Sequence, residues 1–390
     1  MTFDVPSPTL LDTHLYLEIP ENCEPQSAFS NPGSRWRATL NQVALDAVLA
    51  WLRSDYAPQA KVWRQGSLAS LWDAVNGSAI TFDGLRLVLV PTTAIDADEL
   101  RIPQEWVDIP SWVADYYLAV QVNMDEGWLR IDGYTTHQRL KAQASYDADD
   151  RSYSLAAAHL IQDINVLWVA RELCPEETLR AEVAALPALP LAQAENLLQR
   201  LGNPNITWPR LEVPFQLWGA LLEHGGWRQR LYERRQGLPE QWSAQQWLQS
   251  GISQLAQQFG WNHTALQPIA VTGMRSAALP ESGWRKSHAQ TLARELTIAG
   301  AAYELLVLPL EGEDSAWRFE LRPVAANQTI PAGWTLRLLT EDLQAFPNNE
   351  DTATNETAEL YVEVVVEPNE GLVWEITPLP EDYDREVLRF

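Results

Sequence analysis

Apolar residues repeat with two different spacings along the first part of the chain. Residues 14–19 alternate between polar and apolar side chains, which predicts a strand. Residues 39–54 carry apolar side chains at helical spacing, which predicts a helix. Apolar runs on either side of short turn sequences predict hairpins over 79–90 and 116–135. We therefore expect residues 1–150 to form an α+β region.

The middle of the chain has the pattern of a helical region packed on the first. Its helices are expected to begin at capping residues or proline and to end at glycine or proline. The pattern predicts helices over 154–173, 176–185, 191–201, 214–225, 227–236 and 243–259. We expect this region to cover residues 151–265, and the turn-rich residues 261–290 to mark a boundary.

The pattern of the last hundred residues predicts strands separated by turns. The strands are expected at 302–309, 316–322, 334–340, 359–367 and 372–377. In the fourth of them, apolar residues alternate with Glu359, Glu363 and Glu367, as in a strand with one face in water. Residues 290–390 are thus predicted to form an acidic antiparallel β-sandwich, and the whole chain to be α+β.

The charge of the chain limits the partners that it can bind. The 390 residues contain 28 basic and 52 acidic side chains, a formal net charge of −24. Such a charge disfavours direct nucleic-acid binding, which depends on neutralising phosphates, and docking on anionic membranes. Residues 340–390 alone hold 14 acidic and 2 basic side chains. We expect Glu359, Glu363 and Glu367 to bind a protein with a basic surface.

Targeting and cofactor motifs are missing from the sequence. The N-terminus shows no signal peptide and no apolar run is long enough to span a membrane, so we expect a cytoplasmic protein. Two cysteines exclude a disulfide framework, and the six histidines lack metal-ligand spacing. We expect no metal and no cofactor, and the oligomeric state is left open.

One basic cluster lies in the predicted helix 227–236. Arg228, Arg230, Arg234 and Arg235 could form a partner-binding surface, because arginine favours bidentate recognition of carboxylates. The alternative is a solvated helix face, or pairing with the acidic C-terminal region, and we favour that alternative because charge runs usually only solvate a helix.

Tryptophan is unusually frequent, with 18 residues. Most lie in apolar patterns and are expected in the core. Trp106, Trp112, Trp242 and Trp284 lie near turns or polar neighbours, and they are the candidates for exposed aromatics that bind a protein or a sugar.

Hydrolase motifs are weak. Cys174 with a histidine could form a catalytic dyad, but a buried, inert cysteine is the simpler interpretation. The segment His224-Gly225-Gly226-Trp227 is similar to an esterase oxyanion loop. Because no Gly-x-Ser-x-Gly elbow accompanies it, we interpret it as a helix stop with left-handed glycine.

Several long sequence segments of the chain are similar to those of a known family. They include Glu105-Trp106-Val107-Asp108-Ile109-Pro110, Asn165-Val166-Leu167-Trp168-Val169-Ala170-Arg171, Leu211-Glu212-Val213-Pro214-Phe215 and Gly371-Leu372-Val373-Trp374-Glu375-Ile376. Over most of residues 100–390 the chain resembles a cyanobacterial family known only as domain of unknown function 1822. The resemblance implies no catalytic or binding residues. It implies a genetic context beside sigma factors and CHAT-domain proteins, which is an associational argument.

Three functions are compatible with these observations. The first is a non-enzymatic regulatory or adaptor protein whose acidic region binds a basic partner, such as a sigma factor or a CHAT-protease-linked component. The second is a carbohydrate-binding protein that uses exposed tryptophans. The third is a cysteine or serine hydrolase whose motif is unfamiliar.

Overall fold

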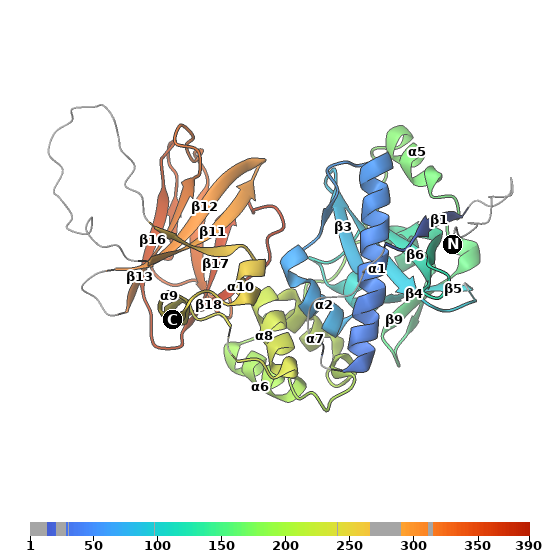
Figure 1. Ribbon diagram of the computed structural model, residues 1–390, viewed down its shortest axis with the longest axis horizontal. Coiled ribbons are helices and arrows are strands. Elements are labelled where there is room, and N and C mark those ends of the chain that lie inside the picture. The colour runs from blue at the N-terminus through green and yellow to red at the C-terminus, as the bar shows by residue number, and fades with distance from the viewer. Residues whose placement is uncertain are drawn as a thin grey trace. The chain divides into compact units, whose positions relative to one another are not determined.

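The computed structural model describes residues 14–20, 29, 31–96, 98–239, 241–265, 290–310 and 315–390 (Figure 1). The chain divides into two compact units. Unit 1 consists of Met1–Leu189, Ala194–His224 and Leu231–Gly237, and unit 2 of Pro190–Gln193, Gly225–Arg230 and Leu238–Phe390. The expected helical region 151–265 is therefore shared between the two units. Cys23, Trp284 and most of the expected boundary at 261–290 lie outside the described residues.

Unit 1 is built on a six-stranded sheet with the order β1-β7-β6-β4-β3-β2. Its strands are antiparallel except for the parallel pair β4–β6. A three-stranded antiparallel sheet has the order β5-β9-β8. These strands are β1 (Leu15–Glu18), β2 (Lys61–Val62), β3 (Ser78–Phe82), β4 (Leu85–Thr92), β5 (Glu99–Pro103), β6 (Tyr116–Asn123), β7 (Trp128–Thr136), β8 (Ser145–Asp147) and β9 (Ser152–Ala156). The predicted strand at 14–19 and both predicted hairpins are confirmed.

The long helix α1 (Pro32–Asp55) lies across the large sheet (Figure 1). Its apolar residues share one core with those of β3, β4 and β6. The helix begins seven residues before the predicted start because Asn31 caps it, accepting a hydrogen bond from the Ser34 amide at 2.9 Å, and Pro32 occupies the first turn. Further helices are α2 (Leu68–Ala74), α3 (Gln104–Asp108), α4 (His137–Gln143), α5 (Asn165–Leu173) and α7 (Phe215–Glu223), while α6 (Leu191–Leu201) and α8 (Gly225–Gln236) contribute residues to both units.

Two helix predictions in the middle of the chain are wrong. The helix expected over 154–173 forms only from Asn165, because Ser152–Ala156 pairs with β5 and β8. The helix expected over 176–185 does not form. Arg180 binds Asp115 through two hydrogen bonds of 2.8 and 2.7 Å, and the Ala181 amide donates to Nδ1 of His137 at 3.0 Å. These long-range bonds hold the segment in another conformation, so tertiary contacts override its helix propensity.

Unit 2 contains two antiparallel sheets. One has the order β10-β11-β12-β13-β16 and the other the order β15-β14-β17-β18. Most of their buried apolar side chains belong to one core cluster, and others form two small clusters. The strands are β10 (Trp261–Ala265), β11 (Gln290–Ile298), β12 (Ala301–Pro309), β13 (Ala316–Pro323), β14 (Thr335–Thr340), β15 (Glu350–Thr352), β16 (Leu360–Val365), β17 (Gly371–Thr377) and β18 (Val387–Arg389). The α+β class is confirmed, and the five strands predicted from the sequence are all present.

The helix predicted over 243–259 is divided into α9 (Ala244–Ser250) and α10 (Gln254–Gln258). Gly251 separates them with a φ of 98°, which a helix cannot accommodate. Ser243 caps α9 and accepts a hydrogen bond from the Gln246 amide, as the sequence suggests. Among the described residues, no helix combines the length and apolar character that crossing a membrane requires.

Candidate functional site

The glutamates predicted to bind a partner lie along one face of β16. Leu360 and Val362 point into the core, whereas Glu359, Tyr361 and Glu363 alternate with them and are exposed. Glu367 is also exposed, two residues after the strand ends. Strand β16 is the last strand of its five-stranded sheet, so this face is built on an edge.

A single arginine on the neighbouring strand β13 organises these carboxylates. The guanidinium group of Arg318 lies 3.1 Å from Glu320, 3.3 Å from Glu359 and 3.4 Å from Glu363. It also stacks on the ring of Tyr361, 3.8 Å from the ring centroid. The Arg318 side chain is only 7% exposed, whereas those of Glu359 and Glu363 are 47% and 48% exposed. One shielded cation therefore faces three carboxylates, two of which reach solvent.

The same face continues across the sheet towards β11. Arg322 of β13 pairs with Glu304 of β12 at 2.8 Å, and the strand register places Glu295 of β11 beside Glu304. We call this surface the acidic face: it consists of Glu295, Glu304, Arg318, Glu320, Arg322, Glu359, Tyr361 and Glu363. Five carboxylates against two guanidinium groups leave it with an excess of negative charge.

Glu320 is the buried carboxyl group of the acidic face. Burial raises the pKa of this carboxyl group above its ordinary value, and the nearby charge of Glu359 raises it further, although Arg318 and Arg322 oppose the shift. By count of charged groups, the acidic face holds more carboxylates than arginines. A cation supplied from outside would be attracted to it.

The acidic face does not resemble a metal or catalytic site. Within the described part of the chain, no group of three or more potential ligands is arranged to hold a metal ion. At the acidic face itself, the guanidinium group of Arg318 occupies the space between the carboxylates. The face also lacks a histidine, cysteine or serine as a nucleophile or base. What this arrangement can do chemically is attract positive charge.

The expectation that Trp106 and Trp112 are exposed is wrong, because both side chains are fully buried. Trp106 donates from Nε1 to the carbonyl oxygen of Asn76 at 2.8 Å, and its ring packs beside those of Trp63 and Trp112. Trp242 is buried as well. A buried indole with its N–H satisfied is a core residue despite its polar sequence neighbours. Among the described tryptophans, Trp36 and Trp208 are the most exposed.

The basic cluster of α8 is not an exposed basic surface. Arg228 pairs with Asp384, Arg230 with Glu341 at 2.6 Å, and Arg235 with Asp73 at 3.1 Å, and all three arginines are buried. Arg234 is 40% exposed and lies 3.5 Å from Glu195. The pairing expected as the alternative is confirmed for Arg228 and Arg230, since Asp384 and Glu341 belong to the acidic C-terminal region.

The residues considered as parts of a hydrolase active site do not form one in the described part of the chain. Cys174 is exposed, so the expectation of a buried cysteine is wrong. It is the C-cap residue of α5, so it does not lie at a helix N-terminus. Gly225 and Gly226 do not have positive φ, so they are not a left-handed helix stop. They are small because Asp384 and Val387 pack directly against them at the start of α8.

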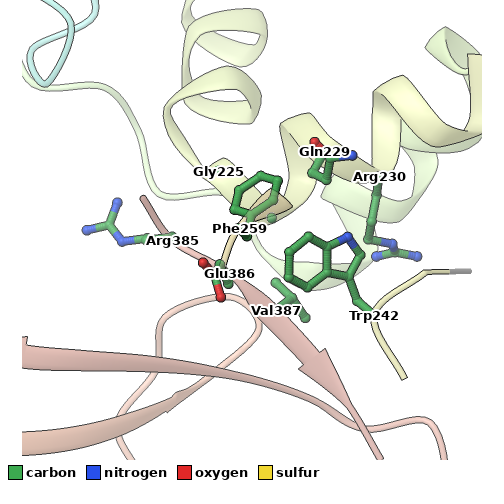
Figure 2. Close-up of a pocket in the computed structure, with 9 residues that line it drawn as sticks. Gly225, Gln229, Arg230, Trp242, Phe259, Arg385, Glu386 and Val387 are labelled. Atoms are coloured by element: carbon green, nitrogen blue, oxygen red, sulfur yellow. The ribbon is translucent and has the colours of Figure 1, made fainter. Parts of the chain in front are cut away.

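A pocket of about 240 Å³, part of it open to solvent, lies at the N-terminal end of α8. Figure 2 shows Trp242, Phe259 and Val387 gathered there with three charged side chains. Those charges are matched within the protein: Arg230 by Glu341, Arg385 by Glu375 at 3.1 Å, and Glu386 by Arg294 at 2.9 Å. Burial also raises the pKa of Glu386. The pocket offers no uncompensated charge or nucleophile to a ligand.

Sequence reasoning found the exposed glutamates of β16 but missed the rest of the acidic face. The alternation of Arg318, Glu320 and Arg322 with apolar residues along β13 was a readable signal for a half-exposed strand. The pairing of β13 with β16, which brings Arg318 beside Glu363, depends on the register of the sheet.

Comparisons with known proteins relate the chain to a family of unknown function. A family model described as "Protein of unknown function (DUF1822)" matches residues 23–389, which is nearly the whole chain. No curated protein and no solved structure matches the chain.

Proposed function

The chain belongs to the DUF1822 family of proteins of unknown function, and we propose that it is a non-enzymatic regulatory or adaptor protein. In this proposal the acidic face of unit 2 binds a protein partner that presents a basic surface. The single observation that carries the proposal is the position of Arg318 against three carboxylates.

The geometry favours recognition by charge. Arg318 holds Glu359 and Glu363 in place and shields part of their repulsion, so their orientation is already set before a partner arrives. The remaining negative charge attracts lysine or arginine side chains and raises the rate of association. Because the two carboxylates are about half exposed, salt screens their interactions. We therefore expect binding that weakens steeply as ionic strength rises.

The partner class follows from the charge and from the family resemblance. A DNA-binding protein such as a sigma factor carries basic faces that normally meet phosphates, and an acidic face competes for them. The genetic context implied by the resemblance makes a sigma factor the first candidate and a CHAT-domain protein the second.

The test is a binding titration between the purified full chain and the sigma factor of its own host at low and high salt. The variant E359Q/E363Q/E367Q removes three exposed charges, and E126Q/E350Q/E356Q removes three exposed charges elsewhere. We expect the first variant to weaken binding at low salt by roughly tenfold or more, and the second by less than about threefold. Equal losses in both variants would show that only total charge matters and would refute a defined site. If neither the sigma factor nor the CHAT-domain protein binds at low salt, the proposal is wrong.

A further inference from the structure

Helix α5 of unit 1 presents apolar side chains to solvent. Val166, Val169 and Leu173 are 43%, 54% and 74% exposed. Their spacing of three and seven residues places them on one face of the helix. Leu167 is the residue of this helix that is buried in the core. We call these three exposed residues the α5 stripe.

The α5 stripe is held on a well-supported helix. Trp168, on the opposite side of α5, stacks on Tyr56 with ring centroids 4.2 Å apart and an interplanar angle of 8°. Arg171 pairs with Asp83 in the turn of the β3–β4 hairpin at 3.0 Å. Figure 1 shows α5 beside one end of α1, where Tyr56 caps that helix. The stripe is therefore a fixed apolar surface rather than a frayed end.

Acidic residues precede and follow the α5 stripe along the chain. Asp163 precedes the helix, Glu172 lies in its last turn, and Glu176 and Glu177 follow in the next turn. Glu172, Glu176 and Glu177 are exposed, and we call these three carboxylates the acidic rim. Negative charge at the C-terminal end of a helix opposes the helix dipole, so these carboxylates do not serve the stability of α5. The basic residue within the helix, Arg171, is already paired with Asp83.

We propose that the α5 stripe is a docking surface for a basic amphipathic helix of a protein partner, whose apolar face covers the stripe while its lysines or arginines meet the acidic rim. The combination of apolar anchors and complementary charge is how amphipathic helices are recognised. A second copy of the chain is the less favourable occupant, because a symmetric contact would place identical acidic rims opposite each other. This surface belongs to unit 1, whereas the acidic face belongs to unit 2.

The first test measures binding of a fluorescent amphipathic peptide built from leucine and lysine, with the full chain in excess. The variant V166S/V169S/L173S removes the stripe. The matched control I95S/V324S/L379S removes three other exposed aliphatic side chains. We expect the stripe variant to bind roughly tenfold more weakly or worse, as for loss of interface anchors, and the control to bind within about twofold of the natural chain. All substituted positions are exposed, so circular dichroism should show both variants folded.

The second test separates the charge contribution. The variant E172Q/E176Q/E177Q should weaken peptide binding severalfold at low salt and little at high salt, and a leucine–glutamate peptide should not bind. Equal peptide binding by the natural chain and the stripe variant would overturn the proposal, as would no binding at all. Dimerisation of the natural chain that the stripe variant abolishes would assign the surface to a second copy instead. The variant E359Q/E363Q/E367Q should keep peptide binding, so failure here and failure of the proposed function can be told apart.

Discussion

Two adjacent arginines of α8 should differ strongly in how much stability the same substitution removes. Arg235 is 2% exposed and pairs with Asp73, which is 4% exposed, at 3.1 Å. Its Nη1 also donates to the carbonyl oxygens of Leu201, Asn203 and Ile206 at 3.2 to 3.3 Å. Arg234 is 40% exposed and lies 3.5 Å from the half-exposed Glu195. We predict that R235M strongly destabilises unit 1, whereas R234M has little effect.

The magnitude follows from what R235M leaves behind. The carboxylate of Asp73 would remain buried after losing the guanidinium group 3.1 Å from it, and removing one partner of a buried pair costs about 3–5 kcal/mol. This cost changes the unfolding equilibrium by roughly 10²- to 10⁴-fold. An exposed pair such as Arg234 with Glu195 contributes about 0–1 kcal/mol, so R234M should fall in that range. Methionine preserves most of the side-chain volume in both variants, so packing differences stay small.

The assay is urea unfolding of the full chain, with hydrogen exchange measured on individual peptides. Peptides from α1 and β6 report on unit 1. Peptides from β12 and β17 report on unit 2, so that the two units are not averaged. The double variant R235M/D73L removes both charges and should recover more than half of the loss, because a buried ion pair often contributes little over apolar residues. Equal losses for R234M and R235M, or a loss below about 1 kcal/mol for R235M, would refute the reasoning.

Three further outcomes follow from the contacts. W106A should destabilise unit 1 by about 3–5 kcal/mol in urea unfolding, because it opens a cavity and leaves the carbonyl of Asn76 without its donor. G226A should cost about 1–3 kcal/mol in the same assay, because a Cβ would lie 3.1 Å from both the Cβ and the amide nitrogen of Val387. The raised pKa of Glu320 means that its ionisation costs the folded state free energy. The stability that protonated Glu320 contributes is therefore lost as the pH rises from the ordinary pKa of 4.5 through the raised pKa. E320Q should flatten that part of the pH–stability curve measured by thermal unfolding.

Each of these outcomes has a control in the same chain. W36A changes an exposed tryptophan and should alter stability by less than about 0.5 kcal/mol. G226A/V387A removes the Cγ2 methyl group of Val387 that would also contact the new Cβ, and it should be less destabilised than the sum of the two single variants. E363Q changes an exposed carboxylate of the acidic face, so it should leave the pH dependence closer to that of the natural chain than E320Q does. The opposite result in any of the three would contradict the contact on which the prediction rests.

Local sequence patterns predicted those strands and hairpins that pack against segments close to them in the sequence. The β3–β4 and β6–β7 hairpins were predictable because a short turn sets the pairing of the flanking strands. The alternation along β16 predicted which side of that strand is buried, and so it predicted the exposure of Glu359 and Glu363. Net charge, likewise, is a property of composition alone.

Tertiary structure decided everything that depends on contacts between distant residues. Residues 176–185 have a helical pattern, yet Arg180 and Ala181 are held by Asp115 and His137 from other parts of unit 1. Whether an arginine of α8 is a buried ion-pair partner or exposed depends on which carboxylate the fold brings beside it, as the contrast of Arg234 and Arg235 shows. The sequence by itself determined that the chain is acidic, α+β and without a familiar catalytic motif. The strand register determined that five carboxylates share one face with two arginines, because pairing distances are set by the folded sheet and not by separation along the chain.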